Sequence, residues 1–202
     1  APSQLAVLDP PNRTTLVGGA PLRLTFSDVS DLADGYALRL RELGLGRDDI
    51  IVTQLPNIAE YPAIYLAAFR LGIIVSPVPM QFRRHELEQI VDLTGARATL
   101  TVRALKGVDY AADAVQLGAG RKLLALCLGD DAPAGSLPFT PAKVTPESRA
   151  ALHEHVAALG VSADGTAWRF WRRADGGRRN AVWDDPAMVA RVLPPPMREL
   201  PH

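Results

Sequence analysis

The stretch from residue 49 to residue 80 constrains the fold most, because a helical pattern lies there between two short apolar runs. The first run, residues 50–54, is rich in β-branched residues and predicts a buried strand. The helical pattern places Ile64, Tyr65, Ala68 and Leu71 on one face and ends at Gly72, where a positive φ is easily adopted. The second run, residues 73–78, predicts another strand. Two apolar strands joined by an amphipathic helix should lie parallel, with a right-handed crossover.

The rest of the chain up to residue 128 continues this alternation. Helices are expected at residues 27–43, 83–95 and 108–117, and strands at residues 98–102 and 122–128. In the first of these helices the apolar stripe is Val29, Leu32, Ala33, Tyr36, Leu40 and Leu43, with Ser27 and Asp28 as candidate caps. Four strands alternating with helices predict an α/β fold with a doubly wound, mostly parallel sheet flanked by helices.

Glycine and proline mark the remaining boundaries. Gly18 and Gly19 predict a hairpin tip between residues 14–17 and residues 22–25. Residues 130–146 have the composition of a linker, and a helix capped by Thr145 should run from there to residue 159. We therefore expect a subdomain at residues 1–140, a linker and helix at 141–160, and an irregular tail rich in arginine, tryptophan and proline at 161–202.

Composition excludes several classes of protein. The net charge is zero and 48% of the residues are hydrophobic, so no global field favours nucleic acid or an anionic membrane. No apolar run reaches the length of a membrane helix, and residues 1–13 lack the pattern of a signal peptide. The single cysteine, Cys127, lies in an apolar run and is expected to be a buried core residue of a protein in a reducing compartment. A cytoplasmic location is the expectation.

Three segments together resemble the AMP-forming acyl and aryl acid ligases. They are LTFSDVSDLADGYALRLRELGLGRDD at residues 24–49, QLPN at residues 54–57, and FRLGIIVSPVPMQFRRHEL at residues 69–87. Their order and spacing match the N-terminal subdomain of these adenylate-forming enzymes, and the resemblance extends from about residue 13 to residue 139. It implies an acid:CoA ligase that activates a carboxylic acid with ATP and Mg and then forms a thioester with CoA. The features resemble enzymes of alicyclic and medium-chain acids as well as aryl acid adenylating enzymes, so the acid stays open.

The catalytic motifs of that family are not recognisable in this sequence. The family's phosphate loop reads Ser-Gly-Thr-Thr-Gly followed by Pro-Lys, and only Asp164-Gly165-Thr166 echoes it here. Lys143 is the last lysine. We therefore expect no catalytic residue, no metal site and no resident cofactor in this chain, and its cofactor-binding residues stay unknown. The hypothesis is a fragment of an AMP-dependent acid:CoA ligase, truncated before the phosphate loop and inactive alone. The alternative is a non-catalytic α/β binding or assembly module derived from the same subdomain.

The tail leaves three interpretations open. It contains all three tryptophans and seven arginines but no lysine, and Trp168–Arg173 and Arg179–Trp183 flank a turn, so it could pack as a hairpin. Tryptophan with arginine can also bind nucleic acid, although interspersed acidic residues dilute the charge and nucleic acid is not the expected partner. The composition also fits a shifted reading frame in a GC-rich gene, and the loss of family resemblance where the phosphate loop should come favours this interpretation or an equivalent truncation.

The remaining candidate side chains favour structural roles. Asn57 has the spacing of a helix cap with Glu60. Arg83, Arg84 and His85 open a helix and should be solvated, although the two arginines could contact an anion. His153, Glu154 and His155 form a poor metal set, because residues two apart on a helix point in different directions.

Two expectations concern partners. The carboxylic acid would bind in the full enzyme, with only residual affinity for an acid or nucleotide at the carboxyl edge of this sheet, where helix N-termini attract anions. The isolated subdomain should expose one apolar face of the sheet or cover it by self-association.

Overall fold

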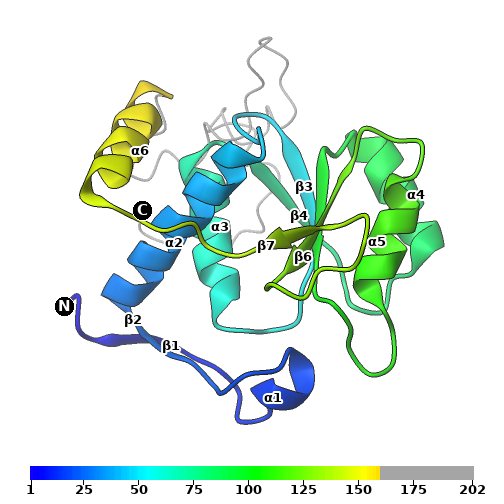
Figure 1. Cartoon of the computed structure of the whole chain (residues 1–202), viewed down its shortest axis with the longest axis horizontal. Coiled ribbons are helices and arrows are strands. Elements are labelled where there is room, and N and C mark those ends of the chain that lie inside the picture. Colours follow the sequence, from blue (N-terminus) through cyan, green and yellow to red (C-terminus); the bar gives the residue numbers. More distant parts are fainter. Residues whose placement is uncertain (160–202) are drawn as a thin grey trace, which may run out of the picture.

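The computed structural model describes residues 1–159, which form a five-stranded sheet with helices on both faces and a separate two-stranded sheet (Figure 1). The strands are β1 (Leu5–Leu8), β2 (Arg23–Thr25), β3 (Ile50–Gln54), β4 (Ile74–Pro77), β5 (Ala98–Thr101), β6 (Leu124–Leu128) and β7 (Leu137–Phe139). The helices are α1 (Arg13–Leu16), α2 (Phe26–Glu42), α3 (Glu60–Arg70), α4 (Arg84–Thr94), α5 (Tyr110–Gly118) and α6 (Pro146–Ala158).

The large sheet has the order β4-β3-β5-β6-β7, and all its strand pairs are parallel. β3 therefore lies between the strand that follows it and the strand after that, which is the arrangement of a doubly wound fold with a topological switch between β3 and β5. Alternate residues of β3 face opposite layers. Ile51 packs in the core with α2 and α3, whereas Ile50 and Val52 pack with α4 and α5. The predicted α/β doubly wound architecture is confirmed.

The helix between β3 and β4 shows how closely local sequence sets this layer. Its buried face consists of Ala63, Ile64, Ala67, Ala68 and Leu71, and the predicted Tyr65 lies at the edge of that face, half-buried. Small residues allow α3 to pack closely against α2. Gly72 takes a φ of 69°, so the chain turns directly into β4, as predicted.

Both faces of the large sheet carry helices within residues 1–159, and the predicted self-association stays a prediction. α2 and α3 cover one face, and α4 and α5 cover the other (Figure 1). The large exposed apolar side chains belong mostly to helices and to the small sheet, with Leu93 of α4 the most exposed at 87%.

Two predictions about strands are wrong. Residues 14–17 belong to α1 and the residue that follows it instead of a strand, and β2 pairs with β1, so the glycines at 18 and 19 connect a helix to a strand. The region predicted as a linker contains β7. Eight residues connect β6 to β7. They are enough to let β7 pair in parallel with β6, because β7 has three residues and the connection must run back along the sheet by only about 10 Å.

The ends of α2, α4 and α6 follow the predicted chemistry, with one shift at α2. Thr25, instead of Ser27 or Asp28, is the N-cap of α2, and the Asp28 carboxylate accepts the Thr25 backbone N–H at 2.8 Å to complete a capping box. Thr145 caps α6 and Gly95 ends α4 in the left-handed region, both as predicted.

The segment that joins β7 to α6 crosses α2 at Gly35. Ala142 donates its backbone N–H to the Gly35 carbonyl at 3.0 Å. A Cβ atom at position 35 would lie 2.8 Å from the Pro141 Cβ and 3.0 Å from the Ala142 carbonyl oxygen. A glycine inside a helix costs up to about 1 kcal/mol relative to alanine, and this close crossing explains its presence.

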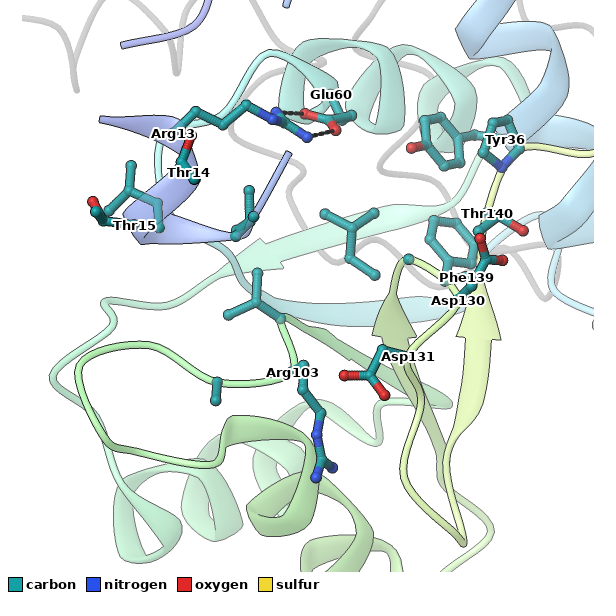
Figure 2. Close-up of a pocket in the computed structure, with 18 residues that line it drawn as sticks. Arg13, Thr14, Thr15, Tyr36, Glu60, Arg103, Asp130, Asp131, Phe139 and Thr140 are labelled. Atoms are coloured by element: carbon teal, nitrogen blue, oxygen red, sulfur yellow. Dashed lines mark hydrogen bonds and ion pairs between the residues drawn. The ribbon is translucent and has the colours of Figure 1, made fainter. Parts of the chain in front are cut away.

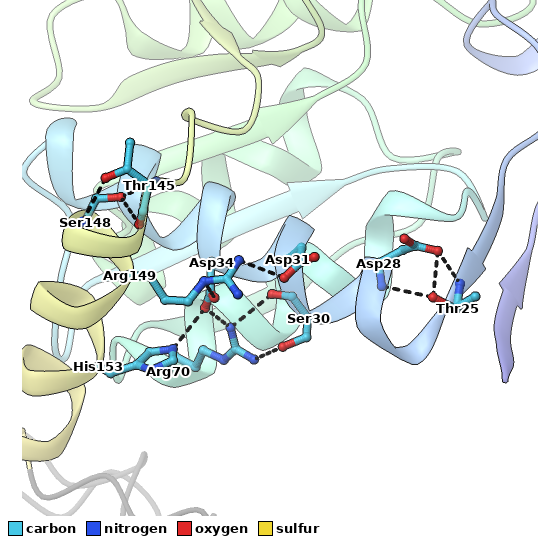
Figure 3. Close-up of polar contacts among 10 residues, drawn as sticks. All are labelled: Thr25, Asp28, Ser30, Asp31, Asp34, Arg70, Thr145, Ser148, Arg149 and His153. Atoms are coloured by element: carbon cyan, nitrogen blue, oxygen red, sulfur yellow. Dashed lines mark hydrogen bonds and ion pairs between the residues drawn. The ribbon is translucent and has the colours of Figure 1, made fainter. Parts of the chain in front are cut away.

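Beyond the crossing, α6 is held to α2 by a buried carboxylate (Figure 3). Asp34 is 2% exposed and pairs with Arg70 of α3, with Arg149 Nε at 3.2 Å and with His153 Nε2 at 3.5 Å. Leu152, fully buried, adds the apolar part of the contact. One carboxylate thus ties three helices together.

We expect Leu71→Ala to lower the free energy of unfolding by about 2–5 kcal/mol, because the fully buried side chain would leave a cavity between α3 and the sheet. Chemical denaturation measures this loss. Leu66→Ala on the same helix is the control, since Leu66 is 42% exposed and its truncation should cost less than about 0.5 kcal/mol. Equal effects of the two substitutions would contradict the assignment of the buried face.

Gly35→Ala should destabilise the protein by about 1–3 kcal/mol, because the added methyl group overlaps the crossing segment. The direction of the change in stability is informative, because helix propensity alone predicts that alanine at this position would stabilise the protein by about 1 kcal/mol. Gly46→Ala is the matched control: a Cβ atom there meets nothing within 4 Å. Thermal unfolding in which Gly35→Ala is at least as stable as the wild type would show that the crossing is not tight.

Candidate functional site

A cavity of about 570 Å³ opens at the carboxyl ends of the central strands, where doubly wound folds bind their ligands (Figure 2). It is lined by the residues that follow β5 and β6, by the end of β7, by α1 and by the first residue of α3. Elements from both sides of the β3–β5 switch therefore contribute to it. This cavity is the candidate functional site.

One wall of the cavity is built on a buried ion cluster. Arg13 Nη1 donates to Asp9 Oδ2 and to Glu60 Oε2, each at 2.7 Å, and Arg13 Nη2 donates to Glu60 Oε1 at 2.5 Å. Asp9 also accepts the backbone N–H groups of Ala59 at 2.7 Å and Leu22 at 2.9 Å. Hydrogen bonding to Glu60, followed by that to Asp9, raises the pKa of Arg13. The cluster fixes the N-terminal segment to the start of α3.

The Asp9 carboxylate replaces the helix cap that the sequence predicted. Asn57 does not cap α3, whose N-cap residue is Ala59, without a side-chain cap. Glu60 turns its carboxylate to Arg13 instead of back to the helix start. Pro62 then lies in the first turn of the helix, where its missing N–H costs nothing.

Tyr36 of α2 forms another part of the wall. Its side chain is buried at 3% exposure and its ring stacks on Phe139 of β7, with ring centroids 5.2 Å apart. Its hydroxyl is directed into the cavity, toward the side where Arg13 and Glu60 lie (Figure 2). Burial, and secondarily the charge of Glu60, raise the pKa of Tyr36, so the hydroxyl stays neutral at physiological pH.

The opposite wall carries Arg103 together with Asp130 and Asp131 (Figure 2). Arg103 Nη2 lies 3.4 Å from a carboxylate oxygen of Asp109, while Asp130 and Asp131 are exposed. The residues that line the cavity include two arginines and three carboxylates, a formal charge of −1.

This charge does not fit ATP with its magnesium. Phosphate sites use cations or arrays of backbone N–H groups, and both arginines of the cavity are already paired with carboxylates. Affinity of this edge for anions, expected from its helix N-termini, is opposed by the same carboxylates. Within residues 1–159, no group of three or more histidine, cysteine, aspartate or glutamate side chains is placed to hold a metal ion.

A second hollow of about 520 Å³ lies at the ends of β3 and β4, lined by Tyr61, Met80 and residues from the two proline-containing turns. Gln54, the last residue of β3, braces this region by donating its amide Nε2 to the carbonyls of Pro79 and Phe82, each at 3.0 Å. The lining is mostly apolar and offers no charged group.

The polar residues singled out in the sequence are dispersed. Arg83 Nη1 donates to the Met80 carbonyl at 2.7 Å and lies near the Tyr110 hydroxyl, and Arg84 Nε donates to Glu88 at 2.8 Å. The exposed side chain of His85 contacts Gln89. The structure thus places Arg83, Arg84 and His85 at the solvated start of α4.

The other singled-out residues have structural positions. His153 belongs to the Asp34 cluster and is not brought together with His155 in a shared site. Cys127 is fully buried, as predicted, and burial raises the pKa of its thiol. The hairpin predicted at residues 168–183 lies outside the described residues.

The residues that do form the site carry no signature in the sequence. Asp9, Arg13 and Glu60 come from segments about 50 residues apart, and Tyr36 reads as one more member of an apolar stripe. The exceptions are Arg103, Asp130 and Asp131, since polar residues that follow a predicted strand are expected at the carboxyl edge.

The fold and this edge define a doubly wound α/β domain with its ligand side at the strand ends. A sequence model of the AMP-binding enzymes matches residues 4–175, and the chain belongs to this family. The match extends beyond residues 13–139, over which the sequence motifs show their resemblance. None of the described helices is long and apolar enough to cross a membrane.

The chain is similar to several ligases over part of its length. It is 39% identical over 92 residues to a 2-hydroxy-7-methoxy-5-methyl-1-naphthoate–CoA ligase of Streptomyces carzinostaticus, covering 46% of this chain and 16% of the relative. It is 38% identical over 77 residues to a salicylyl-CoA synthase/salicylate adenylyltransferase of a Streptomyces species, covering 38% and 14%. The matches thus span about a sixth of the length of these relatives.

Comparison of structures agrees on the fold. The acetoacetyl-CoA synthetase of Streptomyces lividans is similar with a TM-score of 0.53 at 22% identity, covering 62% of this chain and 21% of that one. At this identity the similarity establishes the fold alone. It is the fold of the N-terminal domain of the adenylate-forming ligases.

We expect Arg13→Met to lower the free energy of unfolding by about 3–5 kcal/mol, because Asp9 and Glu60 would remain buried without their cation. Arg23→Met on the exposed side of β2 is the control and should change stability by less than about 0.5 kcal/mol. Adding Glu60→Gln to Arg13→Met should cost less than the sum of the single substitutions, since the two residues contact each other. Additive losses in urea denaturation would contradict a coupled cluster.

Proposed function

We propose that this chain is the N-terminal part of an AMP-dependent acid:CoA ligase. The observation that carries the proposal is the family match over residues 4–175, which coincides with the doubly wound sheet. In the whole enzyme the carboxylic acid would attack ATP to give acyl-adenylate and pyrophosphate. The thiol of CoA would then displace AMP to give the thioester.

We further propose a hydroxyaryl acid as the substrate class. The two relatives named above, at 39% and 38% identity, are named for a hydroxynaphthoate and for salicylate. Both acids carry a hydroxyl group on the aromatic ring next to the carboxylate. The similarity to these two relatives supports this part of the proposal.

The chain alone should not adenylate acids. Preorganised donors around developing charge contribute roughly 10²–10³ each to the rate, and the described carboxyl edge presents carboxylates where such donors would be needed. Holding ATP and acid in line contributes about 7–11 kcal/mol at most, and one sheet with a negatively charged edge cannot supply that positioning.

The test is acid-dependent exchange of labelled pyrophosphate into ATP with magnesium, over hydroxyaryl, alicyclic and fatty acids. The 202-residue chain should show no exchange above the acid-free background. A chimera in which residues 4–159 replace the matching segment of the Streptomyces naphthoate ligase should retain exchange with the hydroxynaphthoate. The same chimera with Arg13→Met should lose activity together with stability.

Each outcome discriminates. Robust exchange by the isolated chain would overturn the proposal that it is an inactive part. A chimera that folds, as judged by circular dichroism, but exchanges no pyrophosphate would favour the alternative, a binding or assembly module that has departed from catalysis.

A further inference from the structure

The outward face of α3 carries no charged side chain between its two ends. Glu60 at the start of the helix pairs with Arg13, and Arg70 at its end pairs with Asp34. The residues between them that are not buried are all aromatic or apolar: Tyr61, Pro62, Tyr65, Leu66 and Phe69. A helix on the surface of a globular protein typically carries charged or polar residues on this side.

The other long helices show that usual pattern. α2, α4 and α6 each present charged side chains to solvent, among them Asp31 and Arg41 of α2, Arg84 and Asp92 of α4, and Glu147 and Glu154 of α6. A single exposed apolar residue, such as Leu93 of α4, lies among such charges and needs no explanation. Among the long helices of residues 1–159, α3 thus differs in having a continuous apolar face.

The aromatic side chains of this face hold one another in place. Tyr61, Tyr65 and Phe69 follow each other about one helical turn apart and pack edge to face, with ring centroids 4.7 and 5.7 Å apart. The Tyr61 and Tyr65 hydroxyls share a hydrogen bond of 2.9 Å. Rigid aromatic side chains lose little conformational entropy when they are covered, and they are enriched in the cores of interfaces.

The face continues into the hollow at the ends of β3 and β4. Tyr61 lines this hollow of about 520 Å³ together with Leu55, Val78 and Met80, and none of the residues that line it within residues 1–159 is charged. We call the face and the hollow together the α3 surface. It lies on the side of the sheet opposite to α4 and α5 (Figure 1), and it begins beside the carboxyl edge, where α3 starts.

The length of the relatives indicates what covers the α3 surface. The chain matches only 16% and 14% of the length of the two Streptomyces ligases, so most of such an enzyme lies outside this segment. A contiguous apolar area marks a contact more often than a free surface. A partner without charges fits it best, because it would release water there without leaving a buried charge unpaired.

We propose that the remaining part of the ligase docks on the α3 surface through an apolar, uncharged face of its own. The proposal rests on the ligase function proposed above and adds the surface through which the two parts meet. Glu60 at the start of α3 also lines the cavity at the carboxyl edge. Docking on α3 therefore brings segments of the partner beside that edge, where cations and N–H donors are needed for chemistry on ATP.

Cysteine labelling tests whether the α3 surface becomes covered. Leu66→Cys lies in the surface, and Leu93→Cys is the matched control, since Leu66 is 42% and Leu93 87% exposed. Reaction with iodoacetamide is followed at each position by peptide mass spectrometry, in the dilute 202-residue chain and in the chimera with the naphthoate ligase. Both positions should react rapidly in the 202-residue chain. In the chimera, position 66 should react at least about 10-fold more slowly, because the contact must open first, and position 93 at an unchanged rate.

A charge at the same position gives a second measurement. Leu66→Lys should leave the melting temperature of the 202-residue chain unchanged, but should lower pyrophosphate exchange by the chimera about 10-fold or more, since the ammonium would lose its water at the contact. Leu93→Lys is the same change on α4 and should alter neither. If the chimera does not fold, cysteines placed in the whole naphthoate ligase at the positions that align with Leu66 and Leu93 give the same labelling comparison.

Three results would overturn the proposal. Equal labelling of position 66 in the chain and in the folded chimera would show that the surface stays open. Equal slowing at positions 66 and 93 would show that the contact does not single out α3. Slow labelling of position 66 in the dilute 202-residue chain would show that another part of this chain, or a second copy, covers it. Exchange by a chimera whose position 66 is unprotected would remove this proposal and leave the ligase proposal standing.

Discussion

The structure depends on one strand whose every side chain is buried. All five residues of β3 are inaccessible, with strands on both sides and helices on both faces. A parallel strand in this position must be covered on both faces, so the crossovers on either side of it have to use opposite faces of the sheet. The central layer, the switch between β3 and β5 and the position of the cavity all follow from that requirement.

Charged groups complete what apolar packing leaves unfinished. One ion cluster, formed by Asp9, Arg13 and Glu60, attaches the N-terminal segment to α3. A second cluster is centred on Asp34, which attaches α2 to α3 through Arg70 and to α6 through Arg149. Both clusters join elements distant in sequence and contain a carboxylate almost without solvent contact. Such clusters add little net stability over apolar residues of similar volume, but breaking one is costly. They therefore fix which elements meet more than they drive folding.

The layered core could be predicted because its signals are local. Three features depend only on neighbouring residues: the apolar run of β3, the buried face of small residues on α3, and the positive φ of Gly72. They predict the strand-helix-strand unit correctly. What failed was non-local. β1 pairs with a strand beyond an intervening helix, and β7 has too few residues for a period to show. Asn57 fits a capping pattern, but Asp9 reaches Ala59 from about 50 residues away.

The site was hidden for the same reason, since its polar residues are partnered across the fold. Their pairing also determines what this edge can do. Arg13 is held by two carboxylates and Arg103 by one, so the charge of each arginine is already balanced within the fold. Chemistry on ATP at this sheet therefore requires cations and N–H donors from other segments, placed so that they outweigh the local carboxylates.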